Sequence, residues 1–210
     1  MSKSKLNSID FLWQSFLNGD DKSFSIIYQR HIHALLAYGM KLCSDRDLVH
    51  DCLQEIFIDL FLKRNKINIG IKNLKSYLFV ALRNCIIKKL TRDKKHDSLN
   101  SAAVSESLEF NIEYSFQDKL IELEISTEIK QKLRSAIVNL PERQKEIIYL
   151  KFEEGLDYKE ISAILKISVE SARKLLYRAL LTLRDSVDPK IVQLLFLASF
   201  KYYSGSMSMF

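Results

Sequence analysis

The chain has 210 residues, with 32 Lys and Arg against 26 Asp and Glu, so its formal net charge is +6. It contains only 5 Gly and 2 Pro, too few for the many tight turns of a β-sandwich or β-barrel. Hydrophobic residues make up 47% of the chain, which excludes wholesale disorder and predicts a mostly helical protein of one or two domains.

Four amphipathic helices are predicted in a first domain, residues 1–96, because apolar residues recur there at three- and four-residue steps. They cover about 9–17, 22–43, 45–63 and 74–94. Gly19-Asp20-Asp21 separates the first two helices, and a polar, basic loop containing Gly70 separates the last two. The apolar stripes of these helices are expected to share one core.

Residues 97–115 are predicted to be an acidic linker, because they are rich in Ser and Asn, lack Lys and Arg, and offer little surface to bury. A second helical domain follows over 116–187. Its predicted helices cover 117–125, 127–139, 141–153, 158–165 and 169–186. The last two have the proportions of a helix-turn-helix. The apolar tail, 188–210, is expected to be helical and to pack on its own domain, to clasp the domains together or to dock on a partner.

The charge is arranged in blocks along the chain. Residues 63–96 carry eleven Lys and Arg against one acid, and residues 97–128 carry eight acids against one Lys. Residues 166–184 carry five Lys and Arg against one Glu. Screening beyond about 8 Å makes such local blocks more informative than the total. Their order suggests two surfaces for an anionic partner, while an ordinary solvated face is the alternative for any single block.

The second helix of a helix-turn-helix presents polar and basic residues to the major groove while its other face is buried. The predicted exposed set is Ser168, Glu170, Ser171, Arg173, Lys174, Tyr177 and Arg178, and the predicted buried set is Ala172, Leu175, Leu176, Ala179 and Leu183. Arg and Lys side chains read guanine edges or hold phosphates. On spacing alone, any two short helices with a polar turn fit equally well.

The stretch over 140–184, from LPERQ through GLDYKEISA to SVESARKLLYRA, resembles the promoter-reading domain of bacterial extracytoplasmic-function (ECF) sigma factors. The first domain independently resembles their other domain, with the pattern D-x-x-Q-E-x-F-x-x-L-F. The resemblance implies that this helix docks on RNA polymerase through Asp51, Gln54, Glu55, Phe57, Asp59 and Leu60. The acids fall near one face and suit a basic partner helix, although a solvated acidic face is the alternative.

The stretch LKSYLFVALRN over 74–84, followed by KKLTR over 88–92, resembles the helix that melts and reads the −10 promoter element. Strand opening needs cations for phosphates and aromatic surfaces for unstacked bases. The implied DNA contacts are Asn65, Asn68, Tyr77, Phe79, Arg83, Asn84, Lys88, Lys89 and Arg92, of which the first two lie in a loop similar to the family's pocket for a flipped base. Core packing is the alternative for Tyr77 and Phe79. Lys88 departs from the family pattern, which often has an acidic or amide residue there, and indicates a phosphate contact.

No cofactor, metal or catalytic site is predicted. The His and Cys residues with the closest spacings match no compact zinc finger: His31, His33, Cys43, His50 and Cys52. No phosphate loop or hydrolase motif is present. The odd number of cysteines without a CxxC pattern indicates a reducing cytoplasm, and neither a signal peptide nor a membrane-spanning run is recognised.

The sequence therefore predicts an all-α sigma factor with two small helical domains. The resemblance implies that it binds core RNA polymerase through the β′ clamp and the β flap and directs promoter recognition, DNA melting and transcription initiation. The resemblance implies an anti-sigma factor as a further partner. The alternative is a free-standing helix-turn-helix regulator with an N-terminal ligand- or partner-sensing domain, and the polymerase-docking pattern argues against it. The acidic linker is expected to enter a basic nucleic-acid channel of polymerase or to act as a spacer.

Overall fold

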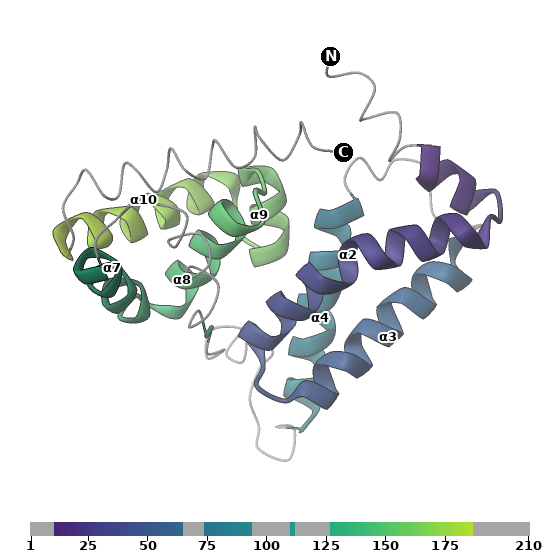
Figure 1. Ribbon diagram of the computed structural model, residues 1–210, viewed down its shortest axis with the longest axis horizontal. Helices are drawn as coiled ribbons and strands as arrows, with labels where there is room; N and C mark the ends of the chain where they lie inside the picture. Colours follow the sequence, from purple (N-terminus) through teal and green to yellow (C-terminus); the bar gives the residue numbers. More distant parts are fainter. Residues whose placement is uncertain (1–10, 65–73, 94–109, 112–126, 187–210) are drawn as a thin grey trace. The chain divides into compact units, whose positions relative to one another are not determined.

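The computed structural model describes residues 11–64, 74–93, 110–111 and 127–186, and the chain divides into two compact units, Met1–Val104 and Ser105–Phe210 (Figure 1). Every regular element in these described ranges is helical. The all-α prediction is therefore confirmed. Among the described residues, no helix combines the length and apolar character that a membrane crossing requires. The tail and the helix expected over 117–125 lie outside the described residues.

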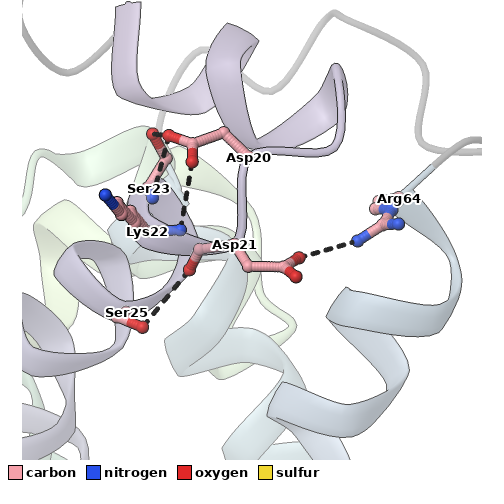
Figure 2. A network of polar contacts seen from close by, with 6 residues as sticks. All are labelled: Asp20, Asp21, Lys22, Ser23, Ser25 and Arg64. Carbon is pink, nitrogen blue, oxygen red and sulfur yellow. Dashed lines mark hydrogen bonds and ion pairs between the residues drawn. The ribbon is translucent and has the colours of Figure 1, made fainter.

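The first unit contains a short helix that includes residues 11–17 and three longer helices. These are α2 (Asp21–Leu42), α3 (Arg46–Leu62) and α4 (Leu74–Asp93), close to the predicted ranges. Asp20 begins α2, because its carboxylate accepts hydrogen bonds from the backbone N–H groups of Lys22 and Ser23 (Figure 2). Asp45 begins α3 in the same way by accepting from the N–H of Leu48 at 3.1 Å.

An ion pair joins the end of α3 to the start of α2. Arg64, just after α3, lies 3.3 Å from the carboxylate of Asp21 at the start of α2, and Figure 2 shows the two side chains reaching toward each other. The same guanidinium lies 4.7 Å from the centre of the Phe61 ring. Rings from three helices meet beneath it, since Phe24 lies 5.2 Å from Phe61 and 5.3 Å from Phe16. This aromatic cluster closes one end of the core.

α2 and α3 pack closely at Gly39. A Cβ atom at this position would lie 2.6 Å from the Val49 Cγ1 atom, a distance that packed side chains do not tolerate. Glycine is therefore required by the approach of the two helices. α4 packs on both α2 and α3, so most of its surface faces the core.

The second unit contains α7 (Thr127–Val138), α8 (Glu142–Ile148), the π-helical turn η3 (Tyr149–Glu153), α9 (Tyr158–Leu165) and α10 (Val169–Ser186). The single helix expected over 141–153 is thus an α-helix that widens into a π-turn. Pro141 precedes α8 as its N-cap, and Gly155 follows η3 with φ +67°, a left-handed conformation that glycine adopts without strain. α10 packs against α7, α8 and α9.

Within the part of the predicted linker that the structure describes, residues 110–111, Phe110 is firmly packed. Phe110 is 2% exposed, its ring centre lies 5.6 Å from that of Tyr149, and its N–H donates to the carboxylate of Glu142. The expectation that residues 97–115 bury little surface is therefore wrong at this position. The average composition of a polar segment does not reveal a single aromatic side chain that can fill a core site.

Candidate nucleic-acid and protein interfaces

Local hydrogen bonds cap the N-termini of α9 and α10. Asp157 and Glu160 form a reciprocal capping box, with N···O distances of 2.8 and 2.7 Å. Lys166 ends α9 in a left-handed conformation with φ 53°. Ser168 then begins α10 by accepting from the N–H of Ser171 at 3.0 Å. A short turn between two capped helices is a helix-turn-helix.

α10 has one buried and one exposed face. Ala172, Leu176, Ala179 and Leu183 are at most 3% exposed. All seven residues predicted to contact DNA are exposed: Ser168, Glu170, Ser171, Arg173, Lys174, Tyr177 and Arg178. Leu175, predicted to be buried, is half-buried. Because Tyr177 is 67% exposed, its ring is not a core residue of this unit.

The charges on this surface are partly paired. Lys174 lies 2.6 Å from Glu170, one helical turn away, and both side chains are mostly exposed. The Arg173 guanidinium lies 5.5 Å from the centre of the Tyr158 ring on α9, and the Lys151 ammonium lies 5.0 Å from the same ring. Cations held over an aromatic face are oriented without losing their charge. The exposed face of α10 can therefore offer oriented cations to an anionic partner.

The predicted docking pattern on α3 divides between surface and core. Asp51, Gln54, Glu55 and Asp59 are exposed, whereas Phe57 and Leu60 are 4% and 1% exposed. The apolar members therefore hold α3 in the core, and only the polar members face outward. Asp59 forms an ion pair with Lys63 on the same helix.

Two apolar residues of α3 that sequence-based prediction missed lie on its outer face. Ile58 is 57% exposed and Leu62 is 71% exposed. Together with Asp51, Gln54 and Glu55 they follow three- and four-residue steps, so they share one helix face. The three- and four-residue spacing from Asp51, Gln54 and Glu55 also predicts, from the sequence alone, that Ile58 and Leu62 lie on this face. This α3 face, defined as Asp51, Gln54, Glu55, Ile58 and Leu62, is acidic at one end and apolar at the other.

α4 presents some predicted DNA-contacting residues and buries others. Tyr77 is 42% exposed, and Lys88 and Arg92 are exposed. Phe79 is 0% exposed and lies 4.9 Å from the Tyr38 ring, while Arg83 is 1% exposed. The assignment of Phe79 and Arg83 to DNA contact is therefore not supported, because both side chains belong to the core that α4 forms with α2 and α3. For Phe79 the packing alternative is favoured.

Two further predicted residues of α4 face α3 or the unit's interior. Asn84 is half-buried, and its Oδ1 atom is buried without a hydrogen-bond donor among the described residues. Lys89 lies 2.8 Å from the Glu55 carboxylate and 3.7 Å from that of Asp51. The Lys89 hydrogen bond lowers the pKa of Glu55 and raises the pKa of Lys89. Asn65 and Asn68 lie outside the described residues.

Two family models match the chain in the two units just described. The model described as "Sigma-70 region 2" matches residues 27–96, and the one described as "Sigma-70, region 4" matches residues 130–183. The chain belongs to the sigma-70 family. Region 2 contains α3 and α4, and region 4 contains the helix-turn-helix.

Curated relatives place this sigma-70 protein in the ECF branch. It is 27% identical over 153 residues to the ECF RNA polymerase sigma factor SigM of Bacillus subtilis, which covers 73% of this chain and 88% of SigM. It is 25% identical over 182 residues to the ECF RNA polymerase sigma-E factor of Escherichia coli K12, covering 84% of this chain and 91% of the relative.

Solved structures share the fold. The sigma factor RpoE of Bartonella quintana, crystallised with the anti-sigma factor NepR, matches with a TM-score of 0.54 and 22% identity over 78% of this chain and 96% of that chain. CnrH, in complex with the cytosolic domain of CnrY, matches with a TM-score of 0.50 and 20% identity over 84% and 94% of the two chains.

Membership of this family establishes the general function. The ECF sigma factor binds RNA polymerase and promoter DNA and directs promoter-specific transcription initiation, and a free-standing helix-turn-helix regulator is not favoured. Sigma factors in general are not enzymes.

Proposed function

We propose that three surfaces of this sigma factor each bind a different partner during transcription initiation. The α3 face docks on the β′ clamp of core RNA polymerase, α4 contacts the −10 element, and α10 reads the −35 element. We further propose that the chain itself has no catalytic activity, acts in the cytoplasm and contacts the β flap through its second unit. The proposed domain divisions are 1–96, 97–115, 116–187 and 188–210.

The observation that carries the proposal is the two-sided character of α10. Seven polar, basic or aromatic side chains are exposed over a buried stripe of small and branched apolar residues. This arrangement suits a recognition helix, because the buried stripe fixes the helix while the exposed side chains reach base edges and phosphates.

The α3 face suits a partner helix that is basic at one end and apolar at the other. Its acids attract Lys or Arg, and Ile58 and Leu62 offer exposed apolar surface that a partner can cover. On α4, Tyr77 can stack on an unpaired base, while Lys88 and Arg92 can hold phosphates. An anti-sigma factor is proposed as a further partner, since the similar sigma factor RpoE of Bartonella quintana was crystallised with the anti-sigma factor NepR.

Run-off transcription with purified core RNA polymerase tests the proposal. The full chain should allow promoter-specific transcripts that core polymerase alone does not make. Arg178→Ala should reduce transcript yield about fivefold or more if Arg178 supplies one base or phosphate contact worth about 1–3 kcal/mol. Arg134→Ala on α7 is the matched control, because Arg134 is exposed and lies on another helix.

Specific promoter binding by the chain alone, without any stimulation of core polymerase, would contradict the sigma role and support the regulator. Full activity of Arg178→Ala, with promoter sequence preference unchanged, would contradict the role assigned to α10.

A further inference from the structure

Two cysteines that are 33 positions apart in the sequence meet between α3 and α4. Cys52 is on α3 and is 0% exposed, and Cys85 is on α4 and is partly exposed. Cys52 lies one helical turn before Glu55 on α3, and the Cys85 thiol contacts the Glu55 carboxylate, so both cysteines lie at the same level of the contact between the two helices. Both thiols are free. α3 and α4 pack directly on each other in the first unit (Figure 1), so the two sulfurs are held together by a packed helix pair.

Polar groups extend this contact to the surface. The Cys85 thiol donates to the Glu55 carboxylate, with an Sγ···Oε2 distance of 3.4 Å, and Lys89 lies 2.8 Å from the other oxygen of Glu55. Cys85, Glu55 and Lys89 therefore form one continuous chain of hydrogen bonds and charges. Its outer end is exposed, because the Glu55 side chain is 62% exposed. A small, polar oxidant can reach Cys85 from this side.

The two thiols differ in the way that a disulfide-forming pair requires. The hydrogen bond from Cys52 lowers the pKa of Cys85. The same hydrogen bond, followed by burial, raises the pKa of Cys52. The thiolate is the nucleophile in cysteine oxidation. Cys85 is thus the residue that meets the oxidant, and Cys52 is the buried neighbour that can resolve the product.

We propose that Cys52 and Cys85 form a peroxide-sensitive dithiol that closes to an intramolecular disulfide between α3 and α4. In the first step the Cys85 thiol releases its proton to solvent, and the thiolate sulfur attacks one oxygen of hydrogen peroxide. The O–O bond breaks, Cys85 becomes a sulfenic acid, and the departing hydroxide takes a proton from solvent to leave as water.

In the second step the Cys52 sulfur attacks the Cys85 sulfur. The S–O bond breaks, the S–S bond forms, and the departing hydroxide takes the proton of Cys52 to leave as a second water. Two thiols are oxidised to one disulfide, and one peroxide is reduced to two waters. The site depends only on the chemistry of this chain and does not rest on the proposed roles of the DNA- and polymerase-contacting residues.

Oxidation would also change the surface next to the site. A disulfide sulfur carries no proton, so Glu55 would lose the Cys85 donor and keep Lys89. Because Glu55 belongs to the α3 face, the oxidation state of the pair changes the hydrogen bonding of that face.

Hydrogen peroxide treatment of the full, reduced chain tests the proposal, and mass spectrometry provides the readout. The three cysteines of the sequence should fall to one free thiol with the loss of two hydrogens from the intact mass. Trypsin should then release peptide 47–63 joined to peptide 84–88, while Cys43 remains free in peptide 42–46. A reductant should restore all three thiols. In the reduced protein, Cys85 should react with iodoacetamide at least about tenfold faster than Cys52.

Three variants provide the comparison. Cys43→Ala is the matched control and should still lose two hydrogens, whereas Cys52→Ala and Cys85→Ala should not. The emission of buried Trp13 in the same unit reports whether each variant is folded. In urea the preference for the Cys52–Cys85 disulfide should disappear, because the unfolded chain closes the shorter loop between Cys43 and Cys52 more readily.

An unchanged count of three thiols in the peroxide-treated chain would overturn the proposal. A disulfide that includes Cys43 in the folded protein, or the loss of two hydrogens from folded Cys52→Ala, would also overturn it.

Discussion

The Lys89 ammonium on α4 lies 2.8 Å from the Glu55 carboxylate on α3. Lys89 was expected to contact DNA and Glu55 to contact polymerase, so the structure joins two residues that had been assigned to separate surfaces. Asp51, another residue of the α3 face, lies 3.7 Å from the same ammonium. A partner helix with basic residues would compete with Lys89 for these acids. The proposed docking through α3 would therefore change the charge available on α4.

The Lys89–Glu55 pair should contribute little to the stability of the free protein. Glu55 is mostly exposed and the Lys89 side chain is 24% exposed, and solvent-exposed ion pairs typically contribute about 0.2–1 kcal/mol. A double-mutant cycle with Glu55→Gln and Lys89→Met, followed by urea unfolding, should give a coupling free energy in that range. The coupling should shrink as salt is added. Lys88→Met, at an exposed neighbouring position, is the control and should show a weaker coupling to Glu55→Gln, because Lys88 acts on Glu55 through its charge without the hydrogen bond that Lys89 forms.

Lowering the pH should destabilise the first unit through His31. Burial, together with the charges of Arg30 and Lys75, lowers the pKa of His31 to about 4. The unfolded chain binds a proton near pH 6.5, whereas the folded chain does so only near pH 4. The contribution of neutral His31 to the free energy of unfolding is therefore fully present above about pH 6.5, and it is lost as the pH falls toward 4.

Between pH 7.5 and pH 5 the free energy of unfolding should decrease by about 2 kcal/mol because of His31. Urea unfolding followed by the fluorescence of Trp13, the chain's single tryptophan, measures this change in the correct unit. His31→Gln should remove most of the pH dependence in this range. His33→Gln, at an exposed position on the same helix, should retain it. Equal pH dependence in both variants would rule out His31 as the source.

A methyl group at Gly39 should loosen the contact between α2 and α3. The new Cβ would lie 2.6 Å from Val49 Cγ1, and overpacking of a well-packed core typically costs about 1–3 kcal/mol. Gly39→Ala should therefore lower the stability measured with Trp13 fluorescence, although alanine favours a helix. Val49→Ala should restore part of the loss when it is combined with Gly39→Ala. Gln29→Ala, at an exposed position of α2, is the control and should be nearly neutral.

Phe110 should stabilise the second unit although it lies in the segment expected to be a linker. Removing a buried phenylalanine ring typically costs about 3–5 kcal/mol, and Phe110 is 2% exposed against Tyr149. Phe110→Ala should reduce hydrogen-exchange protection of the α8 backbone amides, and Phe110→Leu should reduce it less. Phe11→Ala, which truncates a 70% exposed ring, should leave α8 unchanged. Unaltered α8 protection in Phe110→Ala would show that the ring contributes no stability.

The sequence was most informative where the pattern of a single helix determines exposure. On α10, the buried stripe and the exposed face follow from helical spacing, and all seven predicted surface residues are exposed. On α4, the family resemblance assigned Phe79 and Arg83 to DNA contact, but their side chains are 0% and 1% exposed, which favours core packing for both. That helix packs on two neighbours, so its buried surface extends beyond one apolar stripe and includes an arginine. A motif specifies which residues are present but not which way each side chain points.

Contacts between distant parts of the chain were the least predictable. Cys52 and Cys85 meet only because α3 and α4 pack together, and no local spacing indicates it. Phe110 was likewise hidden in a polar segment, because one residue does not change the average composition. In contrast, Ile58 and Leu62 continue the three- and four-residue spacing of the polar residues on the α3 face. Their position on that face can therefore be predicted from the sequence.

The apolar end of the α3 face should be required for polymerase binding and dispensable for folding. Ile58 and Leu62 are 57% and 71% exposed, so replacing either with Glu removes little packed surface, and the free energy of unfolding should change by less than about 0.5 kcal/mol. In a complex, the same charge would be buried without a partner. Each substitution should weaken core polymerase binding about fivefold or more, since such burial costs about 1–3 kcal/mol or more.

Ile26→Glu is the matched control, because Ile26 is 47% exposed on α2 of the same unit and lies outside the α3 face. Fluorescence anisotropy of the labelled full chain, titrated with core polymerase, measures the affinity. If Ile58→Glu and Leu62→Glu bind as tightly as Ile26→Glu, the docking surface ends with the acids of α3, and its apolar end must serve another purpose. A loss in all three variants would instead indicate a nonspecific effect of added negative charge on association.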